Sequence, residues 1–147
     1  AKTVKEWHWG RVHFTDLTAV FCRYSELRDE DAKTRVMLVQ DGKLEEHRAV
    51  LDSTDHVRDK YGIRYPTREV IRSDDGTIIE TEALQVIDSS FYHLRFLTSF
   101  SATFKNGLTR KAIGITEFIA PRALKYRWLN WLSDLRTGKD GKSPFMS

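Results

Sequence analysis

The stretch YHLRFLTSFSATF, residues 92–104, carries the clearest alternation of apolar and polar side chains in the chain. One face holds Tyr92, Leu94, Phe96, Thr98, Phe100, Ala102 and Phe104, and the other is polar except for Leu97. A period of two residues is typical of a β-strand with one buried face. At about 3.3 Å per residue the strand would be roughly 40 Å long, which predicts a curled or bulged strand.

Three dipeptides mark hairpin turns on either side of this strand. Asp41-Gly42, Asp75-Gly76 and Asn106-Gly107 are favoured in type I′ turns, where both central residues have positive φ. Strands are predicted over residues 5–14, 17–24, 35–40, 43–51, 67–73, 77–87, 92–104 and 108–119, with 52–65 as a loop or a short extra strand. About eight antiparallel strands are enough to close a small β-barrel around one ligand.

One helix is predicted, over residues 121–137. Pro121 suits its first turn, Gly138 can end it, and an apolar stripe follows at helical spacing: Leu124, Trp128, Trp131, Leu132 and Leu135. We expect this stripe to pack on the outer wall of the barrel. The alternative is contact with a membrane surface, because basic residues flank the two tryptophans.

Length and composition predict one mainly β domain over residues 1–147, with the barrel over 5–119. The 147 residues are 40% hydrophobic and 31% charged, which is typical of a soluble globular protein. The net charge of +3 comes from interspersed residues, so nucleic acid is not an expected partner. Without a long apolar run or an apolar leader, cytoplasmic localisation is expected. Cys22 is the single cysteine, so no intrachain disulfide can form.

The segment WHWGRVHF, residues 7–14, carries apolar side chains on both faces. Trp7, Trp9, Arg11 and His13 share one face, and His8, Gly10, Val12 and Phe14 share the other. One face is expected to look into the barrel, while the other lies under the helix or closes the barrel end. Packing is the favoured role for the tryptophans, and stacking on a flat or polyene ligand is the alternative.

Two segments carry a family resemblance. EWHWGRV (residues 6–12), followed by TAV (18–20), resembles the start of the C-terminal barrel in carotenoid 1,2-hydratases and AttH-like proteins, and GITEF (114–118) is similar to its last strand. The resemblance implies a lipocalin-like (calycin) barrel whose relatives hydrate, cyclise or bind polyenes and other apolar molecules. The family usually has two barrels, against one here, and a His-x-Trp segment that this chain lacks. The family has a Tyr and an Asp shortly after its Thr-Ala-Val run, and a shift of two positions would match them to Tyr24 and Glu26, the candidate catalytic residues.

We therefore expect a small, largely apolar ligand inside the barrel. The predicted lining is Trp9, Tyr24, Tyr92, Leu94, Phe96 and Phe100. One alternative is an isomerase, cyclase or hydratase acting on a polyene-like substrate, which requires an acid or base facing the cavity. A second alternative is a filled barrel that assembles as a homodimer or larger homo-oligomer.

No cofactor or metal is expected. The chain lacks a phosphate-binding or dinucleotide fingerprint and a Gly-x-Ser-x-Gly motif. None of the five histidines shares a strand face or helix face with another at the spacing of metal ligands. His93 adjoins the predicted lining, but the alternation places it outside the barrel.

Overall fold

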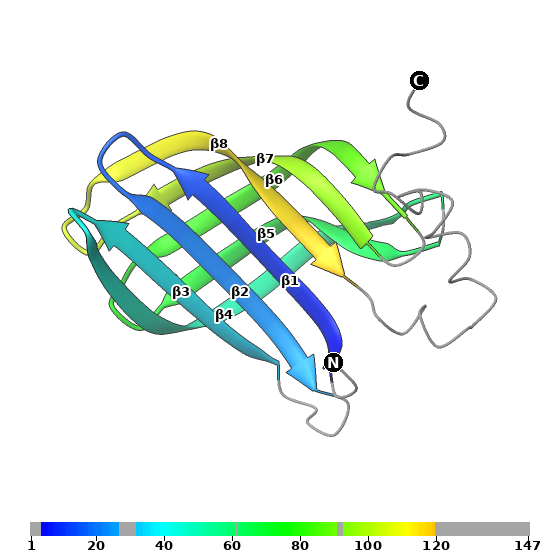
Figure 1. Cartoon of the computed structure of the whole chain (residues 1–147), viewed down its shortest axis with the longest axis horizontal. Coiled ribbons are helices and arrows are strands. Elements are labelled where there is room, and N and C mark those ends of the chain that lie inside the picture. The colour runs from blue at the N-terminus through cyan, green and yellow to red at the C-terminus, as the bar shows by residue number, and fades with distance from the viewer. Residues whose placement is uncertain (1–3, 27–31, 61, 91–92, 120–147) are drawn as a thin grey trace, which may run out of the picture.

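Eight antiparallel strands close into a single barrel in the computed structural model, which describes residues 4–26, 32–60, 62–90 and 93–119. The strands are β1 (Val4–His13), β2 (Thr18–Glu26), β3 (Lys33–Gln40), β4 (Lys43–Arg58), β5 (Arg64–Ser73), β6 (Ile78–Ser89), β7 (His93–Thr103) and β8 (Thr109–Ile119). Each strand pairs with the next, and β8 closes the ring on β1 (Figure 1). The predicted antiparallel barrel is confirmed. The helix predicted over 121–137 lies outside the described residues.

The hairpins stand where they were predicted, but two of the three turns differ in type. Only Asp41 and Gly42 both have positive φ, at 51° and 72°. At the other two turns only Gly76 and Gly107 do, with φ of 92° and 84°. These loops are one residue longer than a two-residue hairpin, because the Gly76 N–H bonds the carbonyl three residues back, at 3.1 Å. A type I turn followed by a left-handed glycine fits that length.

The segment 52–65, predicted as a loop or a short extra strand, is strand at both ends, and the connection between β4 and β5 is confined to residues 59–63. It extends β4 as far as Arg58 and begins β5 at Arg64, and these two residues pair directly. Asp55 has a φ of 54° and interrupts the alternation of β4. The last residues of β4 are exposed on both faces, so this part of the strand keeps its hydrogen bonds without an apolar pattern. The charged residues of the segment therefore suggested a loop.

The middle of the barrel is filled by apolar side chains. The inward face of β7 is buried at Leu94, Phe96, Thr98, Phe100 and Ala102, as the alternation predicts. Phe100 packs against Phe21 with ring centroids 6.3 Å apart. Their neighbours in the same cluster are Val12, Phe14, Ala19, Val36, Ile71, Ile79 and Ala102. Burying side chains of this size contributes about 1.5–3 kcal/mol each.

The barrel has two unlike ends. The turns at residues 14–17, 41–42, 74–77 and 104–108 gather at one end, called here the hairpin end (left in Figure 1). At the opposite end, called here the far end, the pairing of β5 with β6 stops at Arg68 and Glu82 although both strands continue. The two bulges of β6 lie in this unpaired part, between Ala83 and Asp88. The barrel wall therefore parts between β5 and β6 at the far end.

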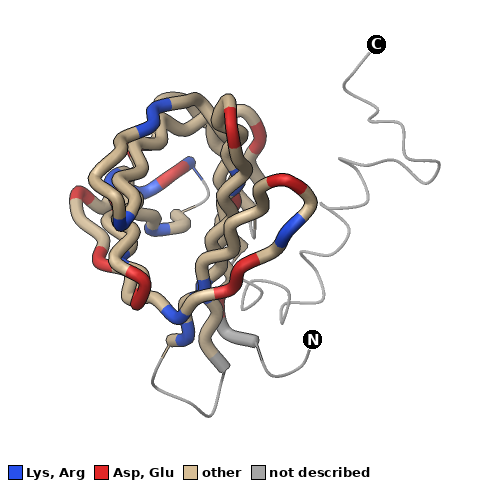
Figure 2. Tube along the Cα trace, turned by 90° about the vertical axis from the view of Figure 1, so that its left-hand side faces the viewer, with Lys and Arg blue, Asp and Glu red and all other residues tan. Residues whose placement is uncertain are grey.

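Charged residues of both signs are interspersed around the ring of strands (Figure 2). Among the residues that the structure describes, there is no helix long and apolar enough to span a membrane.

Candidate functional site

The tryptophan pair lies on the outer face of β1. Trp7 is 45% exposed, and the Trp9 indole N–H donates to Glu117 Oε2 at 3.1 Å. Arg95 donates to Oε1 of the same carboxylate at 2.6 Å, and His93 Nε2 lies 3.4 Å from Oε2. Trp9 is therefore part of a network outside the barrel and does not line its interior.

Of the two candidate catalytic residues, the structure describes the side chain of Tyr24 alone. Tyr24 stands opposite Trp7 in the β1–β2 ladder and shares its outer face. The side chain of Glu26 lies outside the described part of the chain, and so does Tyr92.

The remaining predicted lining residues occupy two levels of the barrel. Leu94 and Phe96 form an apolar cluster with Phe118 at the far end. The Tyr65 ring packs on Phe96 at 4.8 Å, and burial together with the charge of Asp59 raises the Tyr65 pKa. Phe100 belongs instead to the packed middle, where it is 1% exposed.

A cavity of about 320 Å³ lies at the far end. It is lined by Glu6, His8, Arg23, Ser53, His56, Arg64, Pro66, Glu69 and Phe118. Phe118 joins this cavity to the apolar cluster, so the site combines a polar wall with an apolar neighbour. A second cavity, of about 410 Å³, lies at the hairpin end among turn residues such as Asp16 and Arg110, which already pair with each other. The packed middle of the barrel lies between the two cavities.

A buried histidine and a buried glutamate are in contact at the wall of the far-end cavity. His8 on β1 is 4% exposed and Glu69 on β5 is 5% exposed, and His8 Nε2 contacts Glu69 Oε1. The second ring nitrogen, Nδ1, lies 2.8 Å from the backbone carbonyl oxygen of Glu117. A carbonyl can only accept, so Nδ1 carries a hydrogen. The rings of Phe21 and Phe118 pack against His8, with centroids 5.2 and 5.8 Å away.

This pair holds one shared proton. A hydrogen bond between Nε2 and Oε1 needs one hydrogen, supplied either by an imidazolium or by a carboxylic acid. In both forms the pair as a whole is neutral, which lowers the cost of burying it. The other carboxyl oxygen, Glu69 Oε2, is buried and has no hydrogen-bond partner.

A cation lies beside this pair. Arg23 stands opposite His8 in the β1–β2 ladder and lines the same cavity. Its side chain is half-buried, and it makes no hydrogen bond or ion pair within the described ranges. Glu6 and Arg64 also line the cavity, so its charged groups are of both signs.

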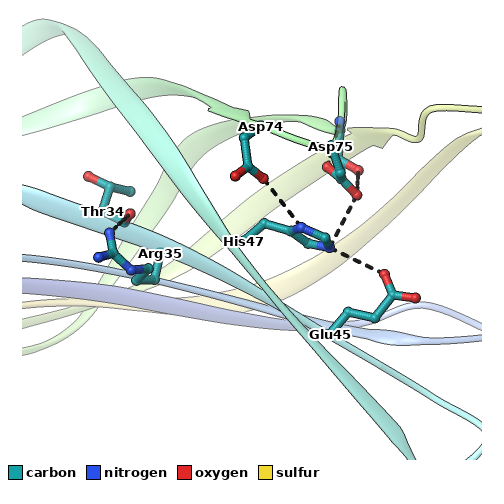
Figure 3. A network of polar contacts seen from close by, with 7 residues as sticks. Thr34, Arg35, Glu45, His47, Asp74 and Asp75 are labelled. Carbon is teal, nitrogen blue, oxygen red and sulfur yellow. Dashed lines mark hydrogen bonds and ion pairs between the residues drawn. The ribbon is translucent and has the colours of Figure 1, made fainter.

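A second polar cluster lies at the hairpin end (Figure 3). His47 Nε2 is 3.2 Å from Glu45 Oε2 and 3.5 Å from Asp75 Oδ2, and Nδ1 is 3.3 Å from Asp74 Oδ1. The hydrogen bond to Glu45 and the two aspartates raise the pKa of His47. Asp75 also accepts from the Thr77 amide and hydroxyl. Glu45, His47 and Asp75 offer ligand atoms within 4.8 Å of one another. This spacing suits a bound cation, and it also suits the direct contacts of His47 with the two carboxylates.

The sequence interpretation missed His8 and Glu69 as site residues, although both carried a signal. His8 is in phase with Gly10, Val12 and Phe14, which turn inward. Glu69 is in phase with Ile71, so a charged residue stands on the buried face of its strand. Their meeting could not be predicted, because 61 residues separate them and only barrel closure brings them together.

Comparison with known proteins finds likeness at the level of structure. No family model and no curated protein matches the chain. Kievitone hydratase from Nectria haematococca superposes with a TM-score of 0.66 at 11% identity, over 80% of this chain and 40% of that one. A protein assigned as an AttH, from Nitrosomonas europaea, has a TM-score of 0.61 at 14% identity, over 82% and 40%. The chain thus spans under half of each, and the likeness shows a shared lipocalin-like barrel fold.

Proposed function

We propose that the protein binds a small, largely apolar molecule in the far-end cavity. The observation that carries this proposal is Glu69 Oε2, a buried acceptor without a partner beside the apolar cluster of Leu94, Phe96 and Phe118. Leaving such an acceptor unpaired costs about 1–3 kcal/mol, which a bound molecule would offset. The cavity volume of about 320 Å³ falls within the range of small-molecule sites.

A second hollow lies outside the barrel, over β5 and β6. A groove of about 400 Å³ runs over the outside of these strands and includes Glu69 in its lining, together with Arg68 and Glu82. Those two residues form the last pair of the β5–β6 ladder. Glu69 therefore lines the interior cavity and also borders the outer groove, with the paired β5–β6 ladder between the two.

Blocking the cavity from one strand tests the binding proposal. Ser53 lines it from β4, and Thr54 beside it is exposed on the opposite face. The neutral dye N-phenyl-1-naphthylamine should fluoresce with the native protein and with Thr54→Phe, and its affinity should fall at least about tenfold with Ser53→Phe. Circular dichroism checks that both variants fold. Equal affinity in all three proteins would place the dye elsewhere and remove support for this cavity.

Acid–base catalysis is the second candidate function, and the shared proton of His8 and Glu69 favours it. In a hydration, the pair would give this proton to one alkene carbon, water would add to the resulting cation, and the proton that water loses would return to the pair. In an isomerisation, the pair would instead take back a proton from a neighbouring carbon. One of the structures named above is a hydratase by name, which supports this class of reaction.

Deuterium incorporation separates an enzyme from a binder. A panel of apolar alkenes is incubated with the protein in D₂O, and the carbon-bound deuterium is measured by mass spectrometry. An enzyme should incorporate deuterium with the native chain and with Thr54→Phe, and lose at least about a hundredfold in rate with Glu69→Gln, which cannot hold the shared proton. Incorporation that persists in Glu69→Gln would exclude the pair as the acid.

A further inference from the structure

We infer that the ligand of the far-end cavity carries a hydroxyl group, as an alcohol or a phenol, which donates a hydrogen bond to Glu69 Oε2. This inference rests on the proposed binding function and names the chemical class of the ligand. It follows from the hydrogens that the two ring nitrogens of His8 can hold.

The first step is that Glu69 Oε2 is an acceptor in both possible forms of the pair. His8 Nδ1 keeps its hydrogen for the Glu117 carbonyl oxygen. If Nε2 is protonated, Glu69 is a carboxylate and both of its oxygens accept. If Nε2 is bare, Oε1 carries the proton that bonds to it, and Oε2 is the carbonyl oxygen of a carboxylic acid. Oε2 therefore needs a donor in either case.

The second step is that the described protein does not supply this donor. Oε2 is buried without a partner even though Arg23 and Arg64 line the same cavity. A molecule that occupies the cavity and offers no donor would displace solvent from Oε2 and leave it unpaired. Ligands that satisfy the oxygen are thereby selected over ligands of the same shape that do not.

The third step concerns the charge of the donor. The His8–Glu69 pair is neutral as a whole, so among the described lining residues an ammonium group would find Glu6 as its one anionic neighbour, against Arg23 and Arg64. Two guanidinium groups disfavour a cationic ligand. A neutral hydroxyl satisfies Oε2 without this repulsion, and the apolar cluster beside Phe118 suits the rest of the molecule.

Two probes of nearly equal shape test the inference. Calorimetric titration at neutral pH compares 1-naphthol, which keeps its phenolic hydrogen there, with 1-methoxynaphthalene, which has no donor. The native protein should bind the phenol at least about tenfold more tightly, a difference of about 1.4 kcal/mol. Glu69→Gln should keep this preference, because its amide N–H can donate to a bare His8 Nε2 while its carbonyl oxygen replaces Oε2.

Glu69→Leu combined with His8→Phe should bind both probes equally, because this variant lacks the Glu69 acceptor and also the His8 Nε2 acceptor that Glu69→Leu alone would leave bare. Glu69→Met replaces Glu69→Leu in this combination if the leucine variant does not fold. The control is Glu46→Leu, which removes an exposed carboxylate of β4 outside the lining of the cavity and the groove and should leave the preference unchanged. Equal binding of both probes to the native protein, or a preference that survives the combined His8 and Glu69 variant, overturns the inference while binding itself stands. If the native protein binds neither these probes nor the neutral dye, the proposed binding function fails instead.

Discussion

Replacing Gly114 with alanine should weaken the seam where β8 closes the barrel on β1. A Cβ atom at this position would lie 2.3 Å from the backbone oxygen of Arg11, 2.9 Å from Phe100 Cε2 and 3.0 Å from Val12 Cα. Ordinary contacts of this kind begin at 3.4 Å, so the Arg11 carbonyl would have to move by about 1 Å. It is part of the backbone and cannot rotate out of the way as a flexible side chain would.

The loss of unfolding free energy in Gly114→Ala depends on which atoms the new Cβ displaces. Extra carbon in a packed core costs about 1–3 kcal/mol, and we expect the upper part of that range because two of the three contacts are with backbone atoms. Domains of this kind unfold with a free energy of about 5–15 kcal/mol. With a urea dependence of about 1–3 kcal/mol per molar, a loss of about 3 kcal/mol lowers the unfolding midpoint by about 1–3 M.

Urea unfolding followed by circular dichroism measures this shift. Ile113→Val is the matched control, because residue 113 precedes the glycine on β8 and is 54% exposed. The control should change the free energy of unfolding by no more than about 0.5 kcal/mol. If Gly114→Ala unfolds at the native midpoint, β8 does not approach β1 this closely, and the barrel closure described here is wrong.

Three other substitutions should have distinct signatures. The pKa of His47 is raised in the folded state, above all by its hydrogen bond to Glu45, so its stabilisation is present below about pH 6.5 and is lost as pH rises through the folded pKa. His47→Gln should therefore lower the free energy of unfolding measured with urea at pH 6, by less than about 1 kcal/mol because the cluster faces solvent, and leave it unchanged at pH 9. Thr98→Val should cost about 1–3 kcal/mol by orphaning the Thr116 hydroxyl, 2.7 Å away, and Thr98→Val with Thr116→Val should recover most of it in a double-mutant cycle. Phe21→Ala should cost about 3–5 kcal/mol in thermal unfolding, and a loss below 1 kcal/mol would contradict its place in the packed middle.

Local patterns predicted the strands well and their connections less well. The alternation over residues 92–104 identified the inward face of β7, because side chains on a strand must point to opposite faces. The same reasoning failed for residues 52–65, where the end of β4 is exposed on both faces and no apolar pattern is required. The dipeptides also did not predict the turn type, because Asp75-Gly76 fits turns of two different lengths.

The candidate site was harder to predict than the fold. Aromatic residues were expected to line a ligand pocket, but Phe100 is packed into the filled middle and Trp9 turns outward to Glu117. Which face of β1 turns inward depends on the neighbouring strands, because both faces carry large apolar side chains. The polar residues His8 and Glu69 were passed over, since a buried ionisable group is stable only with a partner that strand patterns do not reveal.

The sequence by itself determined the strand periodicity, the positions of the hairpins and a barrel as the arrangement that buries one face of every strand. These properties depend on neighbouring residues along the chain, so they can be read from local spacing. Only the tertiary structure decided that His8 and Glu69 share a proton across the interior and that β5 and β6 part beside them. Both depend on how far the strands shift against one another when the ring closes, and that shift is set by packing around the whole barrel.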